Sequence, residues 1–172
     1  MSTTSTSSAR RPLPFGRRAA VALTLGAGMA LTPLPALADS PTGAPAAVAA
    51  PVAAPTAAAQ VAVDTALAQL GDPYVWAGSG PDVFDCSGLT QYAYAAAGVN
   101  LPHSSGMQST LGHPVSVADL QPGDLVFFYS PVSHVGMYIG NGQMVHAPTA
   151  GDVVKVTDLA YMPGLTAARR LV

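Results

Sequence analysis

The most restrictive feature of this sequence is that its first third lacks the side chains needed for a hydrophobic core. Residues 39–56 are mostly Ala, Pro, Val and Thr, with four prolines and no aromatic residue. A segment of this composition stays extended, because it buries too little apolar surface to offset the entropy lost on ordering. We therefore interpret residues 39–56 as a linker and expect one compact domain over residues 57–172.

Residues 1–38 have the three-part pattern of a secretory signal peptide. A polar segment without acidic residues ends at Arg17 and Arg18, an apolar run extends from Ala19 to Leu31, and the sequence Ala36-Leu37-Ala38 follows. The apolar run is shorter than the roughly 20 residues that a membrane-spanning helix needs. The pattern predicts export and cleavage after Ala38, with no stable membrane insertion of the mature protein.

Charge and cysteine content exclude two classes of protein. Beyond residue 38 the chain carries three basic side chains (Lys155, Arg169 and Arg170) against nine aspartates, and it has no glutamate. A domain this acidic neutralises few phosphates, so we predict no nucleic-acid partner. The single cysteine, Cys86, rules out a disulfide framework and a multi-cysteine zinc cluster within the chain.

The order of the expected elements indicates an α+β fold. An Ala-rich segment closed by Gly71 predicts a helix over residues 57–70, and Asp85 is a suitable N-cap for a helix over residues 86–97. A short helix is expected from Ser104 or Ser105 to Gly112. Helices that precede a run of strands favour an antiparallel sheet with the helices packed on it. The expected strands are residues 125–129, 133–139, 143–147, 153–156 and 167–172.

Cys86 is a candidate nucleophile because it lies at the first turn of the second helix. The partial positive charge and free N–H groups of a helix N-terminus stabilise a thiolate, so we expect a lowered pKa for Cys86. Its position alone leaves open the commoner role of a free cysteine, that of a small buried hydrophobic residue. A reactive thiol also needs a base.

Two histidines in neighbouring strands are candidates for that base. If residues 140–142 form a three-residue hairpin loop, His146 pairs with Gly136, and His134 is its diagonal neighbour on the same face, about 7–8 Å away. A two-residue loop would put the two histidines on opposite faces. The three-residue register is also the one that places a set of apolar residues together on the core face: Val135, Met137, Ile139 and Val145.

The other two histidines, His103 and His113, lie in polar, loop-like segments, and we expect both to be solvated surface residues. Two histidines with remote carboxylates match no metal-ligand motif, so we predict neither a metal nor another cofactor. A cysteine at a helix N-terminus packed against a sheet that carries two histidines is the arrangement of thiol acyl-transfer catalysis.

Six stretches of the domain resemble the NlpC/P60 family of cell-wall cysteine peptidases and occur in that family's order. The combination of Asp85-Cys86-Ser87-Gly88-Leu89 with the stretch that starts at His134 is specific. The resemblance covers nearly all of residues 58–172 and implies a papain-like α+β fold, with N-terminal helices packed on an antiparallel β-sheet. The six stretches are YVWAG (74–78), GPDVFDCSGL (80–89), LPHSS (101–105), QPGDLVFF (121–128), HVGMYIG (134–140) and MVHA (144–147).

The resemblance also implies roles for single residues. Cys86 would be the nucleophile, His134 the general base, and His146 the polar residue that orients His134. Tyr74 would line the site and donate its hydroxyl to the oxyanion, together with the backbone N–H of Cys86. The expected oxyanion or substrate-binding residues are Tyr74, Trp76, Asp85, Ser87, Ser104 and Ser105.

Four positions leave alternatives open or depart from the family pattern. Trp76 fits a pocket wall and core packing equally well, whereas core packing is favoured for Phe84. Ala77 replaces the first of two usual glycines, and His103 stands where a longer basic residue is frequent. These departures concern the substrate contacts and not the chemistry.

Only the family resemblance indicates which substrate the protein uses. It implies a secreted, extracellular or wall-associated endopeptidase that cuts peptidoglycan stem peptides between D-γ-glutamyl and a diamino acid. An activating protein partner is left open. One alternative is a thiol amidase or acyltransferase that uses the same residues on a different acyl group. The other is a catalytically idle wall-binding protein, against which the three occupied catalytic positions argue.

Overall fold

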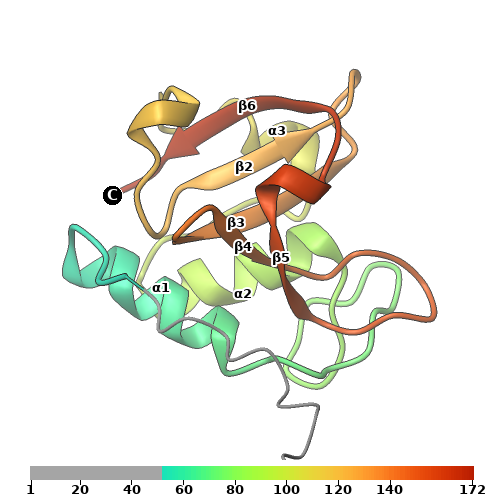
Figure 1. Ribbon diagram of the computed structural model, residues 1–172. Helices are drawn as coiled ribbons and strands as arrows, with labels where there is room; N and C mark the ends of the chain where they lie inside the picture. The colour runs from blue at the N-terminus through green and yellow to red at the C-terminus, as the bar shows by residue number, and fades with distance from the viewer. Residues whose placement is uncertain (1–51) are drawn as a thin grey trace, which may run out of the picture. The chain divides into compact units, whose positions relative to one another are not determined.

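The computed structural model describes residues 52–172, so the predicted signal peptide and residues 39–51 of the predicted linker lie outside the described residues. Within this range all three α-helices precede all the strands, as expected from the sequence (Figure 1). None of these helices is long and apolar enough to cross a bilayer. The α-helices are α1 (Ala57–Leu67), α2 (Cys86–Ala96) and α3 (Ser105–Gln108). The strands are β1 (His113–Pro114), β2 (Leu125–Phe128), β3 (His134–Gly140), β4 (Gln143–His146), β5 (Lys155–Asp158) and β6 (Leu165–Arg170).

The helix starts follow the predicted capping residues. The side chain of Thr56 accepts a hydrogen bond from the Ala59 N–H at the start of α1, and Asp85 accepts one from the Gly88 N–H at the start of α2. Ser104 caps α3 in the same way. The helix α3 ends at Gln108, four residues before the predicted stop at Gly112.

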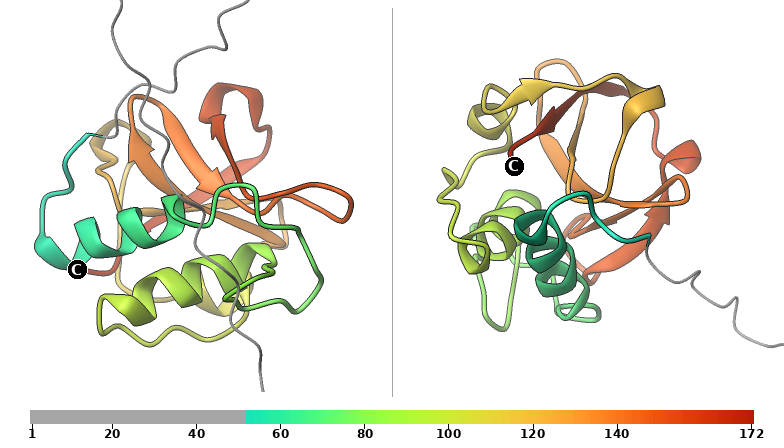
Figure 2. Two further views of the ribbon diagram at one scale, coloured as in Figure 1. Left: turned by 90° about the horizontal axis from the view of Figure 1, so that it is seen from below. Right: turned by 90° about the vertical axis from the view of Figure 1, so that its left-hand side faces the viewer.

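The six strands form one antiparallel sheet in the order β1-β6-β2-β3-β4-β5. Helix α1 packs along α2, and α2 packs against β3, the central strand that carries His134 (Figures 1 and 2). The predicted α+β architecture is therefore confirmed. Its main core lies between the two helices and one face of the sheet, and it includes Val63, Leu89 and the four predicted core-face residues Val135, Met137, Ile139 and Val145.

The opposite face of the sheet is also covered. Val126, Phe128, Met144 and Ala168 form a second buried cluster there. Leu159 and Met162, from and beside the 3₁₀-helix η2 (Leu159–Tyr161), pack on this cluster, as does Leu120, which follows the 3₁₀-helix η1 (Val117–Asp119). Because its central strands are buried on both faces, the sheet is a rigid support for the residues at the start of β3.

The β3–β4 hairpin keeps the predicted register at the histidines but closes differently. Met137 pairs with Val145, the register that puts His146 opposite Gly136. The loop itself has two residues: Asn141 and Gly142 have φ values of 54° and 73°, as a type I′ turn requires. A bulge between Tyr138 and Gly140 holds the extra residue. The predicted three-residue loop is therefore wrong, although the register expected from it is right.

The last two strands are shifted from their predicted positions by two residues. The chain at Val153 and Val154 bonds to the loop after α1 instead of to the sheet: Val153 bridges to Pro73, and the Val154 N–H donates to the Asp72 carbonyl. The sheet pairing of β5 begins only at Lys155. The strand β6 lies at residues 165–170 and not at 167–172, because residues 171 and 172 pack against the main core between the helices and the sheet.

The start of α2 is held against the preceding loop by an unusually close backbone approach. The Asp85 N–H donates to the Gly78 carbonyl over 2.8 Å. A Cβ atom at Gly88 would lie 1.9 Å from the same carbonyl oxygen, so only glycine fits at this position of the helix. This contact fixes the loop that carries Tyr74 and Trp76 next to Cys86.

We predict that Gly88→Ala destabilises the domain by at least about 2–3 kcal/mol, because the added methyl group forces α2 away from Gly78. Urea denaturation measures the loss. Gly106→Ala is the matched control, since a Cβ there would have no neighbour closer than 3.9 Å. Its stability should be unchanged or slightly raised by the helix propensity of alanine. Equal stabilities of the two variants would contradict the close-approach argument.

Candidate active site

A pocket of about 380 Å³ opens where the start of α2 meets the start of β3. Eight of the nine side chains predicted for the site line it, and His146 is the exception. The pocket therefore brings together residues that are spread over 60 positions of the chain, from Tyr74 to His134. Its lining residues are Tyr74, Trp76, Ala77, Asp85, Cys86, Ser87, His103, Ser104, Ser105, Ser133, His134 and Pro148.

Cys86 is the first residue of α2 and is half-buried in this pocket. Burial raises the pKa of the Cys86 thiol, and the nearby Asp85 charge adds to the rise. The backbone N–H groups of Val135, Ser87 and Cys86 itself act in the opposite direction but do not outweigh burial. The expected lowering of the Cys86 pKa by the helix N-terminus is therefore wrong, because desolvation is the larger effect.

His134 and His146 form a hydrogen-bonded pair. Nε2 of His134 lies 2.8 Å from Nδ1 of His146, with the ring planes at 78°. His146 is 2 % exposed and lies behind His134, which explains why it does not line the pocket. Its own Nε2 lies 3.0 Å from Oγ1 of Thr157 on β5.

Both histidines are neutral near pH 7. Burial lowers the pKa of His134 to about 4. Burial also lowers the pKa of His146 to about 4, helped by the neighbouring His134 and Lys155, and Asp152 acts weakly in the opposite direction. A neutral His134 is able to accept a proton, which a general base requires.

The aromatic residues of the loop before α2 divide between pocket and core. Tyr74 lines the pocket, and its pKa is raised by burial and by the Cys86 and Asp85 charges, so the hydroxyl keeps its proton as a donor. Trp76 is 83 % exposed and forms part of the pocket wall, not of the core. Phe84 is fully buried and packs edge-to-face on Tyr92, which confirms the core packing favoured for it.

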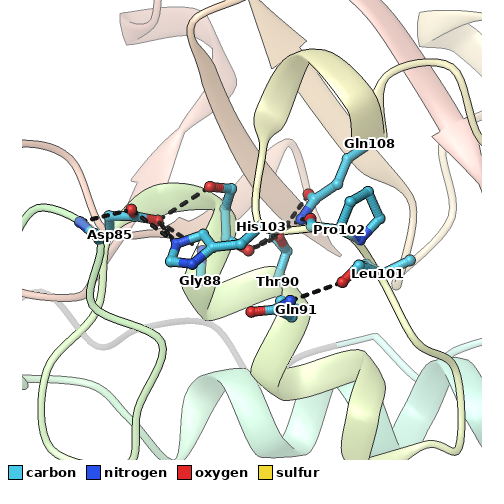
Figure 3. A network of polar contacts seen from close by, with 10 residues as sticks. Asp85, Gly88, Thr90, Gln91, Leu101, Pro102, His103 and Gln108 are labelled. Atoms are coloured by element: carbon cyan, nitrogen blue, oxygen red, sulfur yellow. Dashed lines mark hydrogen bonds and ion pairs between the residues drawn. The ribbon is translucent and has the colours of Figure 1, made fainter.

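Asp85 is the centre of a polar network at one wall of the pocket (Figure 3). Its carboxylate accepts hydrogen bonds from the Ala77 and Gly88 N–H groups and from the Ser87 hydroxyl. Nε2 of His103 lies 2.9 Å from both carboxylate oxygens. His103 and His113 are both exposed, as expected, but His103 is more than a solvated side chain, because its ring also pairs with Asp85 at the pocket wall.

Gln108 holds the far side of this network together, and sequence reasoning missed it. The side chain is fully buried. Its amide donates to the backbone carbonyls of Ser87 and Pro102, and its Oε1 accepts from the Thr90 hydroxyl (Figure 3). The buried amide thus ties α3 and the segment before it to α2, which fixes Ser104 and Ser105 beside Cys86.

A second cavity of about 340 Å³ lies next to the first. Ser133, His134 and Pro148 line both cavities, whereas Cys86 lines only the first. The remaining residues of the second cavity are Tyr129, His146, Thr149 and Met162. His134 therefore stands at the boundary between a thiol-bearing cavity and one without a thiol.

Four pocket residues were not among the predicted site residues: Ala77, His103, Ser133 and Pro148. The signal for His103 was its place next to Ser104 and Ser105, and the signal for Ser133 was its place before His134. Nothing in the sequence marks Pro148. In the described range, residues 52–172, no three His, Cys or Asp side chains cluster as metal ligands.

The pattern of the NlpC/P60 family matches residues 71–167, a stretch that contains Cys86, His134 and His146. A Mycobacterium tuberculosis protein named "Probable endopeptidase" is 43 % identical over 138 residues, which cover 80 % of this chain and 36 % of that protein. A Listeria monocytogenes protein named "Probable endopeptidase p60" is 50 % identical over 88 residues, which cover 50 % of this chain and 18 % of that protein.

Two solved structures support the same fold. The NlpC/P60 domain of the peptidoglycan hydrolase SagA superposes with a TM-score of 0.61 at 35 % identity, over 66 % of this chain and 98 % of that domain. An NlpC/P60 family protein from Bacillus cereus superposes with a TM-score of 0.62 at 40 % identity, over 68 % of this chain and 40 % of that protein. The chain spans between 36 % and 53 % of the mycobacterial and corynebacterial relatives that it matches.

The neutral histidine pair makes stability depend on pH. Each folded-state pKa of about 4 lies below the ordinary value of 6.5, so between these values the unfolded chain binds more protons than the folded one. We expect the free energy of unfolding to be highest above pH 6.5 and to fall by a few kcal/mol as the pH drops to about 4. Urea denaturation at pH 7 and pH 4.5 measures the fall. It should be smaller in His146→Gln, and an equal fall in both proteins would contradict the assignment.

Ala77 carries a backbone conformation that favours glycine, with a φ of 60°. We predict that Ala77→Gly raises the free energy of unfolding by about 0.5–1 kcal/mol, because glycine adopts this left-handed conformation without strain. Ala97→Gly is the control: its φ of −85° carries no such strain, so the added flexibility should lower stability. Urea denaturation checks both, and destabilisation by Ala77→Gly would contradict the argument.

Proposed function

The chain belongs to the NlpC/P60 family, and from this premise we propose that it is a cysteine peptidase that hydrolyses amide bonds in peptidoglycan stem peptides. The observation that carries the proposal is the shared pocket of Cys86 and His134, with His134 hydrogen-bonded to His146 behind it. The relatives named as an endopeptidase and as a peptidoglycan hydrolase support this substrate class.

In the proposed reaction, the Cys86 sulfur attacks the amide carbonyl carbon while His134 takes the thiol proton. The proton moves during the attack and not before it, because the thiol pKa is raised and both histidines are neutral in the free protein. His134 accepts the proton on Nδ1, since its Nε2 faces His146. The resulting imidazolium donates its Nε2–H to Nδ1 of His146.

The negative charge on the carbonyl oxygen is stabilised by two donors. One is the backbone N–H of Cys86, which has no acceptor within α2 because it belongs to the first helical residue. The other is the Tyr74 hydroxyl, which keeps its proton because its pKa is raised. Both donors belong to segments fixed by Gly78 and Gly88, so little reorganisation is needed during the reaction.

Collapse of the tetrahedral intermediate releases the amine and leaves an acyl group on Cys86. His134 gives its proton to the departing nitrogen, and a water molecule then hydrolyses the thioester. Because His134 also lines the cavity that lacks the thiol, we place the amine half of the substrate in that cavity. The acyl half lies in the first cavity, beside Trp76, Ser104 and Ser105.

We further propose that the scissile bond joins D-γ-glutamyl to a diamino acid and that the protein acts outside the cytoplasm after its N-terminal segment is removed. The bond follows from the family resemblance, and the location follows from the sequence pattern of residues 1–38. An acidic enzyme has no long-range attraction to an anionic wall, so this substrate must be bound by short-range contacts within the pocket.

The proposal predicts the products of peptidoglycan digestion. The purified chain should release dipeptide-truncated stems, detected by mass spectrometry, whereas Cys86→Ala and His134→Ala should release none above background, at least about a thousandfold less. His113→Ala is the matched histidine control and should keep full activity, because His113 is exposed on β1, outside both cavities.

Other products would point to the alternatives. Intact stem peptides freed from the sugar would assign the protein as an amidase with the same nucleophile. No product from any variant, together with a Cys86 thiol that resists alkylation near neutral pH, would contradict catalysis and favour a wall-binding role.

A further inference from the structure

The series of hydrogen bonds behind Cys86 continues beyond His146. His134 contacts His146 through Nε2, and His146 contacts the Thr157 hydroxyl through its own Nε2, at 2.8 and 3.0 Å. We infer that Thr157 is a positioning residue of the active site, which holds His146 in the tautomer that lets His134 act as a base. This inference rests on the proposed function of the same site.

The tautomers follow from counting protons along the chain. A neutral imidazole has one N–H and one acceptor nitrogen. His134 must keep Nδ1 free to take the Cys86 proton, so its Nε2 carries the hydrogen and donates to Nδ1 of His146. His146 then has to carry its own hydrogen on Nε2, and the atom that faces this hydrogen is Oγ1 of Thr157.

Thr157 matters most once His134 is charged. The imidazolium donates a stronger hydrogen bond to His146, and this polarises the His146 Nε2–H toward its acceptor. An oxygen at that position stabilises the positive charge that is spread over the two rings. A methyl group there would leave the N–H without a partner in a buried site.

The charged groups around His146 leave this acceptor role to Thr157. Lys155 is the direct cross-strand neighbour of His146 on β5, but its ammonium is paired with Asp152 at 2.5 Å. His134 faces His146 from β3, and Tyr129 lines the cavity that both histidines share. Lys155 opposes the charging of His146, and Asp152 favours it more weakly.

The placement of Thr157 is a consequence of the sheet register. His146 pairs with Lys155 and Met144 pairs with Thr157, so Thr157 is the diagonal neighbour of His146 on the same face. A threonine in β5 is also rotationally restricted about its first side-chain bond, which favours a fixed position of the hydroxyl.

The first test is nuclear magnetic resonance of the ring nitrogens of the wild-type chain at pH 7. We expect His134 and His146 both to carry hydrogen on Nε2. A His146 ring with hydrogen on Nδ1 would overturn the inference at once. This readout does not need activity, so it separates failure of the inference from failure of the proposed function.

The second test compares Thr157→Val, which keeps the shape but removes the oxygen, with Thr157→Ser, which keeps the oxygen. We expect Thr157→Val to lower the rate of peptidoglycan hydrolysis about tenfold, because the buried His146 N–H loses its acceptor. The acid limb of the pH–rate profile of Thr157→Val should move to lower pH, because the protonated His134–His146 pair loses its hydrogen-bond acceptor. Thr157→Ser should stay within about twofold of the wild type.

Two outcomes would contradict the positioning role in this second test. One is a Thr157→Val protein with an unchanged pH profile and unchanged histidine tautomers. The other is a Thr157→Ser protein as impaired as Thr157→Val, since a purely steric role would make both changes harmful. Thermal denaturation of both variants identifies any loss that is due to unfolding.

Discussion

The active site depends on one buried carboxylate, that of Asp85. It caps α2 through the Gly88 N–H, holds the loop before the helix through the Ala77 N–H, and pairs with His103 from the segment before α3. Three successive segments of the chain, the loop before α2, the start of α2 and the segment before α3, therefore converge on the residue next to Cys86. A buried carboxylate is costly unless its oxygens accept hydrogen bonds, so the contacts of Asp85 depend on one another. Each of the three segments is therefore held in place by the other two.

The second organising feature is the neutral histidine pair. A thiol with a raised pKa beside an imidazole with a lowered pKa stays uncharged at rest, so the site stores no ion pair before substrate arrives. In the proposed reaction, the proton transfer is coupled to attack on the carbonyl, and the helix N-terminus and the Tyr74 hydroxyl stabilise the developing charge. The histidine pair is neutral because it is buried, and it is buried because both faces of the sheet that carries it are covered.

Much of this arrangement could be predicted from sequence, and the failures have physical causes. The capping residues and the apolar alternation of β3 predicted α2 and the histidine register, because both depend on local geometry. The Asp85–His103 pair and the Gln108 amide depend on how separate segments meet, which local patterns do not encode. The direction of the Cys86 pKa was wrong because the helix end is visible in the sequence whereas the depth of burial is not.

The central claim is that His134 activates Cys86 within the intact pocket. The most direct test is the rate at which iodoacetamide alkylates Cys86 at pH 7 in the wild-type chain and in His134→Ala, followed by intact-protein mass spectrometry. The structure predicts that alkylation slows at least about tenfold when the base is removed, because the half-buried thiol then has no group to take its proton. Equal rates in the two proteins would contradict the account, since Cys86 would then react without help from His134.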